Sequence, residues 1–223
     1  MSGAPLYAQL INLMAAILLL LAFAMLAQRR VLTLVHLFAC QGIALALSTG
    51  VVAWGTRQPH LYWSTALTVV LKVVLLPYIL HRLVRRLDVR WDVEGLINIP
   101  TTMLIGIVLV VFSFNLAAPI SELASTVTKA TLGIAMACVM LSFLMMITRQ
   151  KAIPQVIGFL SMENGLFFAA TSATYGMPMV VELGIALDVL VGTLILGVFF
   201  FQIREQFDSL DLKHLERLKE SRE

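Results

Sequence analysis

Three ionisable residues, Lys72, Glu163 and Asp188, lie within apolar stretches that are long enough to cross a lipid bilayer. A charge at the centre of a membrane helix costs roughly 2.5–3.5 kcal/mol on insertion scales, so such residues usually pair with one another or line a path for ions. Desolvation favours the neutral form of an acid or an amine, whereas a neighbouring opposite charge favours the ionised form. We therefore predict that these three residues form a proton relay. A static ion pair that holds helices together is the alternative.

Four further polar residues define a secondary polar path: His36, Gln41, Asn164 and Glu182. Gln41 lies about ten residues, or roughly 15 Å, inside its apolar stretch, and Asn164 directly follows Glu163. His36 is placed to pass protons inward, although a lone histidine in a span is often only hydrogen-bonded packing. Glu182 lies at the outer mouth of the last apolar stretch, either as an entry group or as a solvated acid that is favourable at a helix start.

Pro77 lies about one helical turn after Lys72. Proline has no amide hydrogen, so the carbonyl of Val73 loses its helical partner. Within a membrane such a carbonyl must be satisfied by other groups. The sequence therefore predicts a kink and loosened carbonyls beside Lys72.

The elements that must position these residues are membrane helices. Of the 223 residues, 60% are hydrophobic and 13% are charged, about half the charged share of a soluble domain. The mean hydropathy is +0.92. A helix needs about 20 apolar residues to cross the hydrocarbon. We predict an all-α polytopic membrane protein with one transmembrane domain, residues 1–203, whose seven spans are roughly 6–27, 31–55, 62–84, 100–117, 127–148, 153–175 and 181–203.

The basic residues predict how these spans are oriented. Seven spans place thirteen of the Lys and Arg residues on one side: Arg29, Arg30, Arg82, Arg85, Arg86, Arg90, Arg149, Lys151, Arg204, Lys213, Arg217, Lys219 and Arg222. The opposite side has only Arg57 and Lys129. The positive-inside rule then places the N-terminus outside and the C-terminus in the cytoplasm.

Two segments outside the spans combine charged and apolar residues. Residues 85–99 are expected to lie along the cytoplasmic surface. The cytoplasmic tail, residues 204–223, carries Leu210, Leu212, Leu215 and Leu218 among charged residues. This pattern predicts a short amphipathic helix that lies on the lipid interface or against a partner. A solvated tail is the alternative.

The chain aligns weakly with itself. Residues 29–47 match residues 150–168, which places Gln41 opposite Glu163 within about one residue. In the next spans Lys72 falls opposite Asp188. Both triplets of spans begin on the same side, so the alignment predicts a three-helix parallel repeat. The low complexity shared by all apolar helices explains the match equally well.

Several classes of function are excluded by the sequence. Basic residues gather at span ends rather than on a soluble face, which argues against nucleic-acid binding. Cys40 and Cys138 are too few and too far apart for an iron–sulfur cluster or a zinc site. We expect buried, inert thiols, and a disulfide between them is the alternative. There is no phosphate-binding loop, dinucleotide fingerprint or Ser/His/Asp constellation. We expect no enzymatic activity, cofactor or metal in this chain itself.

Five motifs carry a resemblance to a known family: FACQ (38–41), LKVVLLP (71–77), FLSMENG (159–165), VELGIALD (181–188) and LDLKHLERLK (210–219). Together they resemble the component E family of hydrogenase-4 complexes over nearly the whole chain. The last three spans also resemble the K subunit of respiratory complex I and its counterpart in multisubunit cation/proton antiporters. Glu163 lies about one turn later than the acid of the K subunit, with Leu160 at the direct match, and a shift of one turn keeps a carboxylate on the same helix face.

The resemblance implies a subunit in the membrane arm of an energy-converting group 4 [NiFe] hydrogenase or a formate hydrogenlyase-type complex, in the bacterial inner membrane. Its implied partners are antiporter-like membrane subunits and a complex I-like peripheral arm that holds the redox cofactors, in a hetero-oligomer surrounded by lipid. The relay would contribute to proton or sodium translocation coupled to electron transfer elsewhere. An independent small transporter or channel, and a scaffold subunit, are the alternatives.

Overall fold

The computed structural model describes residues 6–57, 59–86, 95–121 and 126–174, and the single positions 184, 187, 190–192 and 194. The chain divides into two compact units, Met1–Ala186 and Leu187–Glu223. All the helices described below belong to the first unit. Glu182, Asp188, the tail 204–223 and most of the predicted seventh span lie outside the described residues, as do residues 87–94.

The described part of the chain is helical, as the sequence predicted. The elements are α1 (Leu6–Ala27), α2 (Val31–Thr56), α3 (Pro59–Thr68), η1 (Val69–Leu75), α4 (Leu76–Arg86), α5 (Ile99–Ser121), α6 (Thr126–Thr148) and α7 (Ala152–Thr174). Here η1 is a π-helical segment that joins α3 and α4 into one continuous rod. When α3, η1 and α4 are counted as one helix, these helices begin and end within four residues of the first six predicted spans.

Five helical stretches are long and apolar enough to cross a membrane: Leu6–Ala27, Val31–Thr56, Leu61–Arg85, Ile99–Pro119 and Thr131–Thr148. Helix α7 is not among them, because Gln155, Glu163 and Asn164 lower its hydropathy. The described residues therefore contain five candidate spans where the sequence predicted seven.

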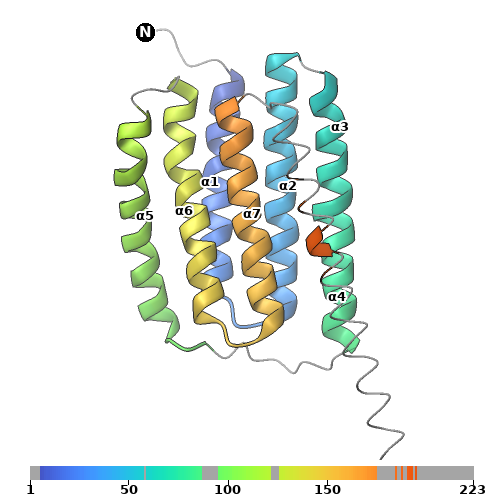
Figure 1. Ribbon diagram of the computed structural model, residues 1–223, viewed down its shortest axis with the longest axis vertical. Helices are drawn as coiled ribbons and strands as arrows, with labels where there is room; N and C mark the ends of the chain where they lie inside the picture. Colours follow the sequence, from blue (N-terminus) through green and yellow to red (C-terminus); the bar gives the residue numbers. More distant parts are fainter. Residues whose placement is uncertain are drawn as a thin grey trace, which may run out of the picture. The chain divides into compact units, whose positions relative to one another are not determined.

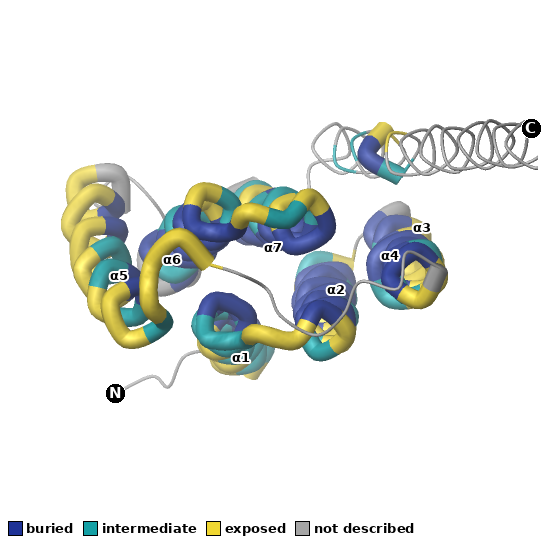
Figure 2. Tube along the Cα trace, turned by 90° about the horizontal axis from the view of Figure 1, so that it is seen from below, coloured by how far each residue is buried: buried dark blue, intermediate teal, exposed yellow. Residues whose placement is uncertain are grey.

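The long helices run side by side (Figure 1). Viewed along the helices, α5, α6 and α7 form one row, whereas α1, α2 and the α3–η1–α4 rod form the other (Figure 2). Helix α6 packs against α5, α7 and α1, and α2 packs against α1, α7 and the rod. Helix α2 is therefore the element that contacts both α7 and η1.

The outside of the bundle is strongly apolar. Large exposed side chains include Trp63, Leu20 and Val108, which are 82%, 68% and 66% exposed. A helix that is apolar on its outer face as well as its inner face belongs in lipid or inside a larger assembly. This is a membrane protein.

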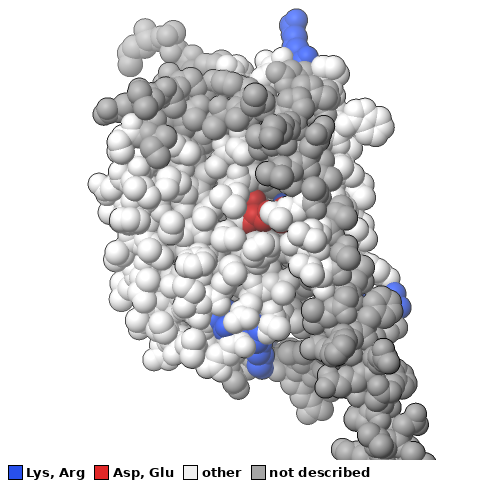
Figure 3. Space-filling model, viewed as in Figure 1, with Lys and Arg blue, Asp and Glu red and all other residues white. Residues whose placement is uncertain are grey.

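Basic side chains are found toward the two ends of the bundle, and an acidic group lies at mid-height (Figure 3). One end carries the turns and helix termini with Arg29, Arg30, Arg82, Arg85, Arg149 and Lys151. We call this end the basic face. Arg57, at the opposite end, terminates α2 in a left-handed conformation with φ of 54°.

Arg149 connects three segments at the basic face. Its Nη2 donates hydrogen bonds to the carbonyl oxygens of Leu26 and Gln28, both at 2.8 Å. Residues 95–96 pair with the end of α6, since Gly95 bridges to Arg149 and the Leu96 amide donates to the Thr148 carbonyl at 2.9 Å. Burial, and then the charge of Arg29, lower the pKa of the Arg149 guanidinium. The sequence predicted only a surface location for residues 85–99, and it treated Arg149 only as a topological charge.

Candidate functional site

The centre of the site is an ion pair between η1 and α7. Lys72 Nζ lies 3.1 Å from Glu163 Oε1. The two residues are 1% and 3% exposed, so very little of the pair reaches the surface. Both lie near the middle of their helical rods. Among the described residues Glu163 carries the only carboxylate, so the acidic group seen at mid-height in Figure 3 is part of this pair.

Two amides extend the pair to α2. Lys72 Nζ also donates to Asn164 Oδ1 at 2.8 Å, and Asn164 Nδ2 donates to Gln41 Oε1 at 3.1 Å. Both amide residues are completely buried. In both of these hydrogen bonds the donor is on the side of Lys72 and the acceptor is on the side of Gln41. Gln41 Nε2 is therefore the last donor group of this series of hydrogen bonds. We call Lys72, Glu163, Asn164 and Gln41 the polar cluster.

The backbone that carries Lys72 is irregular. The π-helical segment extends from Val69 to Leu75, and the Leu76 amide donates to the Leu71 carbonyl, five residues earlier. The absence of an amide hydrogen on Pro77 removes the helical partner of Val73, which favours this wider turn. The predicted irregularity beside Lys72 is therefore present, as a π-helix.

Glycines allow the backbones to approach each other around the cluster. A Cβ at Gly42 would lie 3.1 Å from the carbonyl oxygen of Lys72 and 3.3 Å from its Cβ. A Cβ at Gly165 would lie 3.0 Å from Val139 Cγ2 on α6. Small residues at helix contacts bring polar groups on neighbouring membrane helices within hydrogen-bonding distance. Gly42 was not among the residues predicted for the site, although its position next to Gln41 was a usable signal.

Phe167 covers the ammonium group. Lys72 Nζ lies 5.7 Å from the centroid of the Phe167 ring, within the range of a cation–π interaction. Phe167 is one helical turn after Glu163 on α7 and is 5% exposed. The ammonium group is thus shared by a carboxylate, an amide oxygen and an aromatic face. The sequence analysis did not identify Phe167, because nothing in an apolar helix distinguishes one aromatic residue from another.

The structure brings together four of the seven predicted site residues. His36 lies outside the polar cluster, near the basic face, where its ring is close to that of His81. Asp188 and Glu182 lie outside the described residues, and their predicted roles remain predictions. Cys138 is buried and Cys40 is exposed, and both are free thiols, so the expectation that both are buried is wrong for Cys40. Cys40 faces outward, whereas the next two residues of α2, Gln41 and Gly42, are buried.

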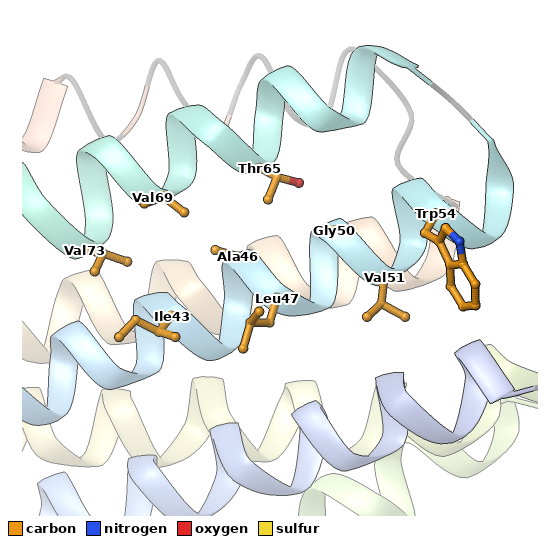
Figure 4. A pocket seen from close by; sticks show the side chains of 9 residues that line it. All are labelled: Ile43, Ala46, Leu47, Gly50, Val51, Trp54, Thr65, Val69 and Val73. Carbon is orange, nitrogen blue, oxygen red and sulfur yellow. The ribbon is translucent and has the colours of Figure 1, made fainter.

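An apolar groove of about 440 Å³ lies between α2 and the α3–η1 part of the rod (Figure 4). It is lined by Ile43, Ala46, Leu47, Gly50, Val51, Trp54, Thr65, Val69 and Val73. Among the side chains that line it, only Thr65 and Trp54 carry a polar atom, and the Thr65 hydroxyl already donates to the Leu61 carbonyl at 2.9 Å. This groove has no chemistry to offer an ion, so the polar cluster is the candidate functional site.

Relatives support the same family that the motifs indicated. The chain is 31% identical over 204 residues to the uncharacterised protein Rv0085 of Mycobacterium tuberculosis, covering 91% of this chain and 93% of that protein. It is 23% identical over 183 residues to hydrogenase-4 component E of Escherichia coli K12 and of Shigella flexneri, covering 82% of this chain and 84% of each relative. No family model matches the chain, and no solved structure gives a significant match. With these relatives spanning most of its length, the chain belongs to the hydrogenase-4 component E family.

Proposed function

We propose that this protein is a non-catalytic membrane subunit of a hydrogenase-type complex, to which it contributes charged groups for proton or sodium translocation. Electron transfer takes place in other subunits. The relatives named hydrogenase-4 component E support the assignment to such a complex. The five apolar helices support the location in a membrane.

The observation that carries the proposal is the buried Lys72–Glu163 pair with its extension to Asn164 and Gln41. Apolar residues of similar volume often replace a buried ion pair with no loss of stability, so stability alone is a weak reason to keep one. Two acceptors and an aromatic ring share the ammonium group, which gives it alternative partners when Glu163 is protonated. These features support a relay over a static pair.

The proposed relay also includes Asp188, the second acid predicted from the sequence. A proton that neutralises Glu163 weakens its attraction for Lys72 and releases the ammonium group toward another acid. Asn164 and Gln41 keep the vacated position polar, because their amides donate and accept hydrogen bonds at the same time. Protonation of one acid is thereby coupled to ionisation of the other.

We propose seven spans with the basic face in the cytoplasm, in the bacterial inner membrane. The gathering of Arg29, Arg30, Arg82, Arg85 and Arg149 at one end of the bundle supports this orientation. The proposed partners are antiporter-like membrane subunits and a peripheral arm with the redox centres. The largely exposed α5, with Leu104 and Val108 64% and 66% exposed, offers an apolar face to such a subunit or to lipid.

The test uses the whole complex, purified through a tag on this chain and reconstituted into proteoliposomes. Glu163→Gln removes the charge with little change in shape. We expect a less stable subunit, because Lys72 loses its counter-charge, in a complex that still assembles and transfers electrons. Coupled ion uptake should fall on the order of a hundredfold, the usual contribution of a positioned proton-transfer group. Gln155→Leu is the matched control, since Gln155 lies on α7 but binds only the Arg149 carbonyl.

Mass spectrometry of the co-purified proteins separates the alternatives. Antiporter-like subunits and a redox arm support the proposal, whereas a chain that purifies alone and moves ions in liposomes is an independent transporter. If Glu163→Gln, Asp188→Asn and Lys72→Ala all leave coupled pumping intact in an assembled complex, the subunit is a scaffold and the relay is wrong.

A further inference from the structure

His36 of α2 and His81 of α4 lie next to each other in the structure, although they are far apart in the sequence. Their ring centroids are 6.2 Å apart and their planes meet at 61°. His36 is exposed and His81 is partly exposed, so the pair lies at the surface of the α2–α4 contact. From the sequence, a role was predicted for His36 alone and none for His81.

The pair lies between the basic face and the polar cluster. His36 is five residues after the start of α2, and His81 is five residues before the end of α4. Because α2 begins and α4 ends at the basic face, both rings lie about 7.5 Å inside it. Gln41 is five residues further along α2, and Lys72 is nine residues before His81 in the same rod. The two elements that carry the pair therefore also carry two members of the cluster.

The chemistry of imidazole suits this position. One ring nitrogen accepts a proton from interfacial water while the other releases a proton, so the ring passes a proton without a net change. A water hydrogen-bonded to both rings would carry the released proton to the second ring. A plain aromatic packing pair is the alternative, worth about 0.5–1.5 kcal/mol.

We infer that His36 and His81 act together as the proton-exchange site between water at the basic face and the polar cluster. This inference rests on the proposed function. The buried ammonium and carboxylate need a route to water, and the histidine pair is placed at the same end of the elements that hold Lys72 and Gln41. Each ring supplies one transfer step, so removal of either ring interrupts the route.

The test measures proton uptake by the reconstituted complex with His36→Gln, His81→Gln and the double variant. We expect each single variant to slow uptake at least about tenfold, the double variant to be no slower than the singles, and added free imidazole to restore the rate. His60→Gln is the control, since His60 belongs to α3, at the opposite end of the rod. If the two rings only packed against each other, free imidazole would not restore the rate of proton uptake.

Zinc ions give a second measurement. Two neighbouring imidazoles bind Zn²⁺, and bound Zn²⁺ blocks their exchange of protons. Among the described residues there is no cluster of three metal-ligating side chains, so water would complete the coordination. We expect Zn²⁺ to inhibit uptake by the unmodified complex and by His60→Gln, and not to inhibit the residual uptake of His36→Gln or His81→Gln.

Two results overturn the inference. One is uptake at the unmodified rate with unchanged Zn²⁺ inhibition in both single variants. The other is slowed uptake, together with lower thermal stability, that free imidazole does not restore. Either result leaves the proposed function standing as long as Glu163→Gln abolishes uptake. Uptake that is unaffected by Glu163→Gln, Asp188→Asn and Lys72→Ala alike overturns the proposed relay instead, whatever the histidine variants do.

Discussion

Lys72 and Glu163, which are 91 positions apart in the chain, meet in the interior of the bundle with 3.1 Å between Nζ and Oε1. Neither side chain is more than 3% exposed. In an apolar interior each charge depends on the other for stabilisation, because water is not there to replace a lost partner. The two residues are therefore expected to behave as a unit, both in stability and in proton transfer.

The first prediction concerns this dependence. Removal of one partner leaves a buried uncompensated charge, so Lys72→Met should destabilise the protein by about 3–5 kcal/mol. The double variant Lys72→Met/Glu163→Leu should recover most of that loss, since no charge is left in the interior. Thermal unfolding of the purified protein in detergent measures both. A double variant as unstable as Lys72→Met would show that the ion pair does not govern stability here.

The helices were predictable from the sequence, whereas the contacts between them were not. Apolar runs are limited in length by the bilayer and interrupted by charged turns, so the bounds of α1 and α2 could be predicted within one residue. Which acid meets Lys72 depends on how the helices pack, and an apolar helix carries little sequence information about its neighbours. The contact of His36 with His81 was concealed for the same reason.

Local chemistry was informative where it acts through the backbone. Pro77 predicted a distortion beside Lys72 because the missing amide is a property of proline itself. The bridging role of Arg149 could not be predicted, since its acceptors are backbone carbonyls at the end of α1 and just after it, about 120 residues earlier in the chain. Those carbonyls carry no signature in the amino-acid sequence.

The second prediction concerns the contact between Gly42 and Lys72. In Gly42→Ala the new methyl group would lie 3.1 Å from the Lys72 carbonyl oxygen, a backbone atom that cannot move alone. We expect lower thermal stability and slower proton uptake, because the η1 segment must shift away from α2. Gly50→Ala is the control on the same helix, since its methyl group meets Thr65 Cγ2 at an ordinary 3.6 Å.

The Gly50→Ala control should be neutral or stabilising by up to about 1 kcal/mol, because alanine favours the helix over the unfolded chain. Both measurements, thermal unfolding and uptake by the reconstituted complex, are made on both variants. Equal behaviour of the two would mean that the close approach at Gly42 does not position Lys72.

The third prediction concerns the link from Lys72 to α2. Asn164→Leu removes the acceptor of one Lys72 hydrogen bond and the donor to Gln41. Interhelical hydrogen bonds in membrane proteins contribute about 0.6–2 kcal/mol, so the loss of stability should be modest. The loss of proton uptake should be much larger if the amides keep the transfer route polar. Asn115→Leu is the control, since Asn115 bonds only to the Val111 carbonyl within its own helix.

A variant Asn164→Leu that pumps like Asn115→Leu would remove the amides from the proposed route. It would leave the Lys72–Glu163 pair as the whole of the relay in the described part of the chain. Asn164→Gln distinguishes geometry from polarity, because it retains the amide and displaces it by one methylene group.

The fourth prediction concerns the bridge at the basic face. Arg149→Met removes two hydrogen bonds to the Leu26 and Gln28 carbonyls, and bonds to charged groups are worth about 1.5–3 kcal/mol each. Arg149→Lys should recover only part of the loss, because an ammonium group is not a planar fork. Arg82→Met is the exposed control at the same face and should have little effect. Thermal unfolding measures all three variants, and equal midpoints for Arg149→Met and Arg82→Met would contradict the bridging role.

The last prediction separates stability from function at Pro77. Pro77→Ala supplies the missing amide to the Val73 carbonyl, which favours an ordinary α-helix over the π-helical turn. If the π-helical turn became an α-helical turn, that turn would contain one residue fewer. The residues before it would then be rotated about the helix axis by about 100° relative to α4. Lys72 would then point away from Glu163. We expect a helix that is regular and no less stable in isolation, in a protein whose proton uptake is strongly reduced.

Pro119→Ala is the matched control, because Pro119 also lies inside a helix, α5, and is remote in sequence from the polar cluster. Uptake should be unchanged in Pro119→Ala and reduced in Pro77→Ala, while far-ultraviolet circular dichroism shows full helix content in both. The contrast is diagnostic because a general effect of proline removal would act on both variants alike. Equal uptake in the two variants would mean that the π-helix does not position Lys72 for proton transfer, and that the irregular turn is only a consequence of proline in a membrane helix.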